Sequence, residues 1–86
     1  MKIYLHKNFR KQYKQAPKIV QIKYHERRNL FARDPFNAIL HNHALKGEYA
    51  GYWSINITGD WRVVYYKMGD DTVVFTKIGT HSQLYG

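Results

Sequence analysis

Two histidines, an arginine and an aspartate in the second half of this chain are residue types that transfer protons and bind anions. His43 and His81 can each serve as base or acid near neutral pH, because an unperturbed imidazole has a pKa of about 6.5. Arg62 carries a permanent, planar charge that suits a phosphate, and Asp60 could orient a histidine or take a proton itself. This combination favours acid–base chemistry on a phosphate ester.

Cleavage of RNA would use these groups without a metal ion. The reaction needs a base for the 2′-hydroxyl proton, a cation for the extra negative charge and an acid for the leaving 5′-oxygen. Tyr85 or Trp61 could stack on a base or hold a ribose. His41 and His43 could be taken for a metal-binding pair, but the chain has no cysteine and offers no third spaced ligand. We therefore expect no metal ion and no cofactor.

Each of these residues also has a purely structural interpretation. A single histidine is more often a surface residue or a hydrogen-bonded structural residue than a catalyst. Asp60 follows Gly59, which is ordinary turn chemistry, and Arg62 could be a charge on an edge strand. Tyr85 could be an apolar lock for the C-terminus. The residue types alone leave catalysis and structure open as alternatives.

The positive charge of the chain is concentrated in its first third. The net charge is +8, and residues 1–33 carry ten Lys and Arg against the single Glu26, whereas residues 34–86 are slightly acidic. A one-sided basic surface favours a polyanionic partner, either nucleic acid or an acidic protein. The alternative is a solvated helix face that only aids solubility, and the apolar face that membrane binding requires is thin.

Size and composition indicate one domain that folds alone. A chain of 86 residues forms one modest core, and 44% hydrophobic residues with 16% aromatics are too many for a disordered chain. The absence of cysteine fits a reducing compartment. The sequence contains neither the apolar region of a signal peptide nor an apolar stretch long enough to span a membrane. We expect a single domain over residues 1–86, in the cytoplasm and without a membrane partner.

The first half predicts a strand followed by a helical hairpin. Residues 2–6 alternate and predict a short strand, and Asn8 is expected to cap a helix over residues 9–15. Pro17 is expected to open a second helix that ends at Arg33. The apolar stripe of that helix is expected to face the core; its residues are Ile19, Val20, Ile22, Tyr24, Leu30 and Phe31.

The second half has the period of strands. Alternation interrupted by turn residues predicts a three-strand meander, preceded by a short helical turn or compact loop over residues 36–45. The strands are expected over residues 52–58, 61–67 and 72–78. Trp53, Ile55 and Ile57 are expected to face the helices. The order of elements predicts an α+β fold in which the N-terminal strand and the helical hairpin pack on a small antiparallel sheet completed by the meander.

Four short motifs follow one another in residues 35–86. They are His43 in His-x-Leu-x-Gly, a Gly-Tyr strand, Asp60 in Asp-Trp-Arg-Val-Val-Tyr, and His81 in a terminal Gly-Thr-His-x-x-Leu-aromatic-Gly. The ordered set resembles the YafQ branch of the RelE/ParE toxin superfamily, and the helical hairpin matches it by layout. The resemblance implies a RelE-like fold.

The resemblance also implies a function. It implies the toxin of a type II toxin–antitoxin system, a ribosome-dependent endoribonuclease that cleaves mRNA and is silenced by a cognate antitoxin. The expected partners are therefore the antitoxin, the ribosome and mRNA. The implied catalytic residues are His43, Asp60, Arg62, His81 and Tyr85. Further contacts to RNA are expected from Trp61, Lys46, Arg27 and Arg28.

One position departs from the branch. A further histidine is familiar where this chain has Asn56, and an amide cannot shuttle a proton near pH 7. Two alternatives remain: a non-catalytic toxin of the same fold that inhibits a protein target, as gyrase-poisoning relatives do, or an RNA-binding module without turnover. The histidine set argues against the first, and the effect of His81→Ala would decide the second.

Overall fold

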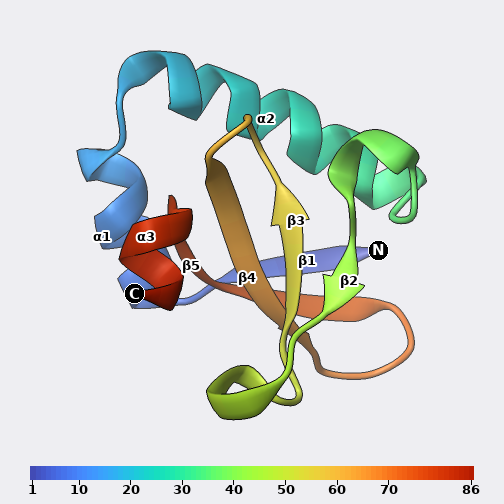
Figure 1. Cartoon of the computed structure of the whole chain (residues 1–86). Coiled ribbons are helices and arrows are strands. Elements are labelled where there is room, and N and C mark those ends of the chain that lie inside the picture. Colours follow the sequence, from blue (N-terminus) through green and yellow to red (C-terminus); the bar gives the residue numbers. More distant parts are fainter.

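A five-stranded sheet forms the centre of the molecule, with strand order β1-β5-β4-β3-β2. The computed structural model describes residues 1–86 and is drawn in Figure 1. The elements in chain order are β1 Lys2–Leu5, α1 Lys7–Gln15, α2 Lys18–Arg33, the 3₁₀ turn η1 Ala38–Leu40, β2 His43–Ala44, the 3₁₀ turn η2 Gly47–Tyr49, β3 Trp53–Asn56, β4 Trp61–Lys67, β5 Thr72–Thr80 and α3 His81–Tyr85. The predicted α+β class is confirmed. None of the helices is long and apolar enough to cross a membrane.

The sheet is mixed, whereas the sequence predicted an antiparallel one. β1 lies parallel to β5, with Ile3 opposite Val73 and Leu5 opposite Phe75, and all other neighbours are antiparallel. Parallel neighbours require a long connection between them, which here includes both helices. Local alternation along β1 predicts a strand but contains no information on the direction of a partner so distant in sequence.

The first helix begins earlier than predicted. His6, not Asn8, is its N-cap, and the His6 Nδ1 atom accepts a hydrogen bond from the Asn8 backbone N–H at 3.1 Å. An imidazole nitrogen thereby does the work of the usual cap oxygen. Asn8 lies inside the first turn, so the prediction of Asn8 as the cap was wrong.

The second helix has the predicted bounds but buries only part of the predicted stripe. It follows Pro17 and ends at Arg33, as expected. Val20, Tyr24 and Phe31 are buried, whereas the side chain of Ile22 is 52% exposed and that of Ile19 is 68% exposed. At 3.6 residues per turn, Ile22 lies about 180° around the helix from the three buried residues. Ile22 therefore points away from the sheet when those residues face it. The expectation that Ile19 and Ile22 face the core was wrong.

The core lies between the helices and one face of the sheet. Phe9, Tyr24 and Phe31 of the helices pack against Tyr65 and Phe75 of the strands through tilted and edge-on rings. The buried cluster also contains Ala16, Val20, Leu40, Ile55, Ile57, Val63, Val73 and Ile78, with Trp53 packed against it. The predicted inward orientation of Trp53, Ile55 and Ile57 is therefore confirmed.

A bulge in β5 lies opposite Val64 and Tyr65 of β4. Val64 pairs with Lys77 and Tyr65 with Phe75, which leaves Thr76 as the extra residue. The Thr76 hydroxyl donates to the Val64 carbonyl at 3.0 Å. Such a bulge redirects side chains, and here Lys77 lies on the open face of the sheet between the core residues Phe75 and Ile78.

The C-terminal residues form a short helix that the sequence did not predict. β5 continues to Thr80, and α3 begins at His81 with a capping box in which Thr80 and Gln83 bond each other's backbone N–H. Leu84 is buried over Gly79, where an added Cβ would lie 3.3 Å from the Leu84 side chain. α3 therefore packs on the end of β5, beside α1 in Figure 1.

Candidate active site

A hollow of about 380 Å³ opens on the sheet face opposite the core. Its wall is formed by β2, β3, β4 and α3, and its residues are His41, His43, Leu45, Ser54, Asn56, Arg62, His81 and Tyr85. Strand register explains the convergence, because His43 pairs with Ser54, and Arg62 lies between Asn56 and Gly79. Four of the five residues predicted to be catalytic, all except Asp60, meet in this hollow.

His43 has one ring nitrogen fixed and the other unengaged. Its Nδ1 lies 2.8 Å from the His41 carbonyl oxygen. A carbonyl can only accept, so Nδ1 carries the proton and Nε2 of the neutral ring keeps a free lone pair. A neutral ring in this tautomer can act as a general base through Nε2. The two-residue strand β2 that holds His43 has no periodic signal, and the sequence predicted only a loop or helical turn there.

His41 is a residue of the hollow that sequence reasoning did not assign to the site. Its ring centroid is 4.8 Å from that of His43. Its φ of 46° places it in the left-handed region, which is uncommon for a residue other than glycine. The two imidazoles are not joined by a third potential ligand, since no group of three or more His, Cys, Asp or Glu side chains suited to a metal is found.

His81 and Tyr85 lie one helical turn apart on α3. Their ring centroids are 4.9 Å apart, as expected for an i, i+4 pair. The Tyr85 hydroxyl donates to the Ser54 Oγ of β3 at 3.0 Å, and the His81 backbone N–H donates to the Asp60 carbonyl at 3.0 Å. These two bonds hold α3 against the sheet while the His81 ring stays exposed.

Arg62 supports the turn between β3 and β4. Its guanidinium donates to the backbone carbonyls of Thr58, Gly59 and Trp61 at 3.0 to 3.1 Å. A guanidinium has five N–H donors, so two remain after these three bonds. Arg62 thus stabilises the turn and still brings an uncompensated positive charge to the hollow.

Asp60 does not place its carboxylate in the hollow. It is exposed in the β3–β4 turn, where its backbone N–H lies 3.4 Å from the Thr58 hydroxyl. Its backbone carbonyl, through the bond to His81, is the part of Asp60 that touches the site. Asp60 therefore makes its only hydrogen bonds through the backbone.

Asn56 contributes an unsatisfied polar atom beside the hollow. Its Oδ1 is buried without a hydrogen-bond partner, and the residue lies directly opposite Arg62 in the sheet. A buried unpaired acceptor costs stability, and such groups concentrate where a ligand or a water completes the bonding.

The residues predicted to contact RNA are not gathered at this hollow. Trp61 is half-buried and packs against the core, on the face opposite Arg62. Arg27 and Arg28 belong to α2, which packs on that same core side. Lys46 is exposed at the start of η2, one residue beyond Leu45 of the hollow.

Burial changes the acidity of two tyrosines on the core side. Burial raises the pKa of Tyr24 to about 12, and the nearby Arg28 guanidinium offsets part of that rise. Burial likewise raises the pKa of Tyr65 to about 12. Both phenols lie in the core rather than in the hollow, so their shifts concern stability.

A family model described as "Bacterial toxin of type II toxin-antitoxin system, YafQ" matches residues 1–86. Among curated relatives, "Toxin YoeB" of Mycobacterium bovis is 45% identical over 49 residues, which is 57% of this chain and 56% of the relative. The "mRNA interferase toxin YafQ" of Escherichia coli K12 is 35% identical over 52 residues, 60% of this chain and 55% of the relative. The chain thus matches about half the length of these relatives.

The fold extends the similarity to the whole chain. The structure described as the E. coli DinJ-YafQ toxin-antitoxin complex contains a chain that is 28% identical, with a TM-score of 0.80. The match covers 98% of this chain and 96% of that chain. The likeness therefore includes the helical hairpin, which the sequence motifs matched only by layout.

Proposed function

Because the chain belongs to the YafQ family of bacterial type II toxins, we propose that it is an mRNA interferase that cleaves mRNA on the ribosome by metal-independent acid–base chemistry. The observation that carries the proposal is the hollow on the open sheet face, where the imidazoles of His43 and His81 and the guanidinium of Arg62 converge from two strands and a helix. These are the groups that cleavage of a phosphodiester needs.

His43 is the general base in this proposal. Its fixed Nδ1–H leaves Nε2 to accept the proton of a ribose 2′-hydroxyl. The 2′-oxygen then attacks the adjacent phosphorus and forms a 2′,3′-cyclic phosphate as the bond to the 5′-oxygen breaks. His81, protonated and exposed on α3, donates the proton that the leaving 5′-oxygen takes up. One proton is taken and one is returned, so the reaction needs no further reactant.

Arg62 and Asn56 stabilise the charged intermediate. The two unused guanidinium N–H groups of Arg62 suit the two non-bridging oxygens of the phosphorane. Asn56, directly across the strand pair, also lines the hollow, and its amide N–H groups can donate to the bound strand, whereas its buried Oδ1 is out of the substrate's reach.

Asp60 and Tyr85 position the acid and the substrate. Asp60 holds the first residue of α3 through its backbone carbonyl, and its exposed carboxylate can accept a hydrogen bond from the bound strand. Tyr85 closes the hollow, fixed through its hydroxyl to Ser54, and offers its ring for stacking on a base.

Residues outside the hollow are proposed to contact the ribosome and the antitoxin. Arg27, Arg28 and Lys46 are proposed to contact the ribosomal RNA backbone and to attract an acidic segment of a cognate antitoxin. Trp61 lies on the helix side, so its proposed contact is to ribosomal RNA rather than to the cleaved strand. The ribosome is the site of action, which places the protein in the cytoplasm.

Induction of His81→Ala in bacteria tests the proposal. Wild-type protein is expected to arrest growth and to create new 5′ ends in ribosome-bound mRNA, whereas His81→Ala is expected to do neither. The matched control is His25→Ala, which removes an exposed histidine on α2 that bonds Tyr13 far from the hollow and should leave both effects intact. Full growth arrest by a folded His81→Ala protein would refute the nuclease and favour an inhibitor that acts by binding.

A further inference from the structure

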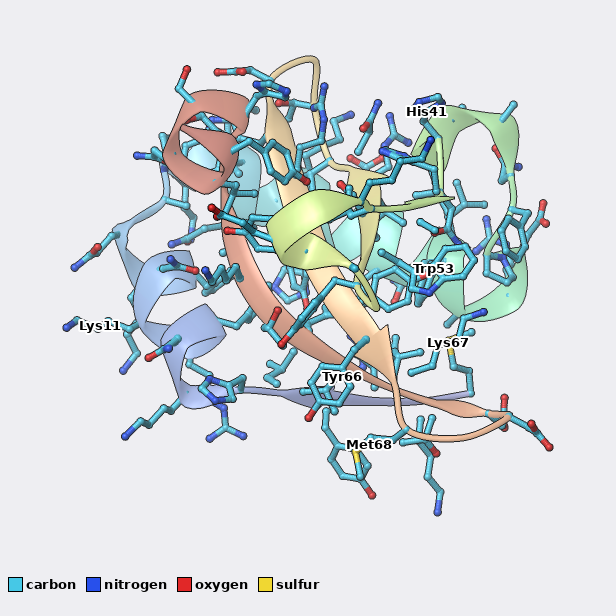
Figure 2. The ribbon with its side chains drawn as sticks, turned by 60° about the horizontal axis from the view of Figure 1, so that its bottom comes forward. Lys11, His41, Trp53, Tyr66, Lys67 and Met68 are labelled. Atoms are coloured by element: carbon cyan, nitrogen blue, oxygen red, sulfur yellow. The ribbon has the colours of Figure 1, made fainter.

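A second and larger hollow, of about 730 Å³, lies on the same open face of the sheet. It is bounded by the start of α1, by η2 and by strands β4 and β5, and Figure 2 shows Tyr66 projecting from the sheet in this region. The side chains that define it are His6, Glu48, Tyr49, Tyr52, Tyr66 and Lys77. None of them belongs to the candidate active site.

A continuous series of aromatic rings connects the two hollows. Tyr85, which lines the active site, lies 5.6 Å from Tyr49 between ring centroids; Tyr49 lies 6.1 Å from Tyr52, and Tyr52 lies 5.8 Å from Tyr66. Each contact is edge-on, with interplanar angles of 84 to 88°. All four rings are half-buried, so each keeps part of its surface accessible from the open face.

Tyr49 is held by hydrogen bonds at the junction between the two hollows. The Tyr49 hydroxyl donates to the Leu84 carbonyl of α3 at 2.8 Å. The Lys77 ammonium lies 3.3 Å from the Tyr49 hydroxyl and 5.2 Å from the centroid of its ring. The β5 bulge is what turns Lys77 to this face, so strand geometry, aromatic rings and a cation combine at one place.

We propose that this second hollow binds single-stranded RNA next to the cleaved bond, with bases stacked on Tyr52 and Tyr66 and a backbone phosphate held by Lys77. The inference rests on the proposed function, because the series of rings begins at the active site. Aromatic platforms bind successive bases without sequence preference, since every base has a stacking face, and a neighbouring cation tracks the backbone. The subsite would hold the strand in register without choosing a codon.

Charge favours RNA over a segment of an acidic antitoxin in this hollow. An acidic peptide binds best where cations cluster, and the basic excess of this chain lies in residues 1–33 of the first strand and the helices. The second hollow is lined by one lysine and one glutamate, Lys77 and Glu48, which form no ion pair, so Lys77 is available for a single phosphate while no cluster of cations is offered to an acidic peptide. Stacking surface is therefore what the hollow mainly offers, and unpaired bases are the partner that uses it.

Binding of a fluorescent octanucleotide tests the inference. The probe is single-stranded RNA with 2′-O-methyl riboses, which cannot be cleaved, so its fluorescence anisotropy reports affinity at low salt independently of catalysis. Tyr52→Leu and Tyr66→Leu keep apolar volume but remove the ring, and each should raise Kd by about 5- to 150-fold, the range measured for loss of one stacked base. Tyr66→Phe keeps the ring and should bind like wild type.

A control variant and two contrary outcomes complete the test. Tyr4→Leu removes an exposed tyrosine of β1 outside the hollow and should not change Kd. Unchanged Kd in both folded leucine variants would overturn the inference, and so would weakened antitoxin binding with unchanged RNA affinity, which would assign the hollow to the antitoxin. If wild-type protein cleaves no mRNA but the leucine variants still lose affinity, the subsite stands and the proposed nuclease fails.

Discussion

The two faces of the sheet have opposite characters although they alternate along the same strands. On the helix side, Phe75 and Tyr65 are fully buried among rings from α1 and α2. On the open side, Arg62 and Tyr66 are half-buried and border two hollows. Stability is thus concentrated on one face, and the groups able to do chemistry are concentrated on the other.

This separation explains how so small a protein can hold polar groups together. A domain of this size has little core to spare, so charged groups are placed where they remain in contact with water. The open face keeps that contact, and the short helix α3 and the 3₁₀ turn η2 give it walls. One cation also lies on the core side: Lys67, the last residue of β4, has its ammonium 4.1 Å from the centroid of the Trp53 ring. Figure 2 shows these two side chains next to each other.

The largest effect on stability is expected from the core face. Phe75→Ala should lower the free energy of unfolding by about 3–5 kcal/mol, because it removes a ring that contacts four others and leaves a cavity. Lys77→Ala, on the open face, removes only a hydrogen bond and a cation–π contact to Tyr49 and should lower the free energy of unfolding by about 1 kcal/mol or less. Urea unfolding of both variants measures the difference, and equal losses would contradict the separation of the two faces.

Gly79→Ala should affect activity more than stability. The added Cβ would lie 3.1 Å from Gln83 Oε1 and 3.3 Å from Leu84, so α3 must shift, and α3 carries His81 and Tyr85. We expect a loss of about 1–3 kcal/mol in stability and a larger proportional loss in mRNA cleavage. Gly59→Ala is the matched control, because a Cβ there meets nothing within 4 Å. Normal cleavage by Gly79→Ala would show that the seating of α3 is not important.

The smallest effect concerns pH and the core tyrosines. Since folding raises the pKa of Tyr24 from 10.0 to about 12, the folded state keeps a phenol proton that the unfolded chain releases. Stability should be unaffected below about pH 10 and should fall as the pH rises from about 10 towards 12. Tyr24→Phe should flatten this decline and cost little at neutral pH, because the hydroxyl has no hydrogen-bond partner. Melting temperatures near pH 8 and near pH 11 measure the effect, and an unchanged alkaline decline would exclude Tyr24 as its source.

The parts of the fold that sequence could predict are those with a long local signal. β4 has its predicted bounds, residues 61–67, because alternation there is bounded by turn residues at both ends. The second helix was predicted from Pro17 and from its apolar stripe, of which only one side is buried. The strand β2, with two residues, and the helix α3, with five, were missed because they are too short to show a hydrophobic periodicity. The direction of β1 was missed because it depends on a partner at the other end of the chain.

The sequence could predict which residues form the site, but not how they are arranged or which hydrogen bonds they make. The motifs and residue types pointed to His43, Arg62, His81 and Tyr85, which the hollow unites. The backbone role of Asp60, the turn bonds of Arg62 and the series of tyrosine rings depend on register and on the β5 bulge. None of these features leaves a pattern in local sequence.

The central claim is that His43 and His81 act as one acid–base pair within a single hollow. Its most direct test is cleavage of ribosome-bound mRNA by His43→Ala, His81→Ala and the double variant, each first shown to melt like wild type. Residues that act as a unit are non-additive, so each single variant should lose about 10²–10⁴-fold and the double variant little more. Losses that multiply in the double variant, or a single variant with normal cleavage, would contradict the claim.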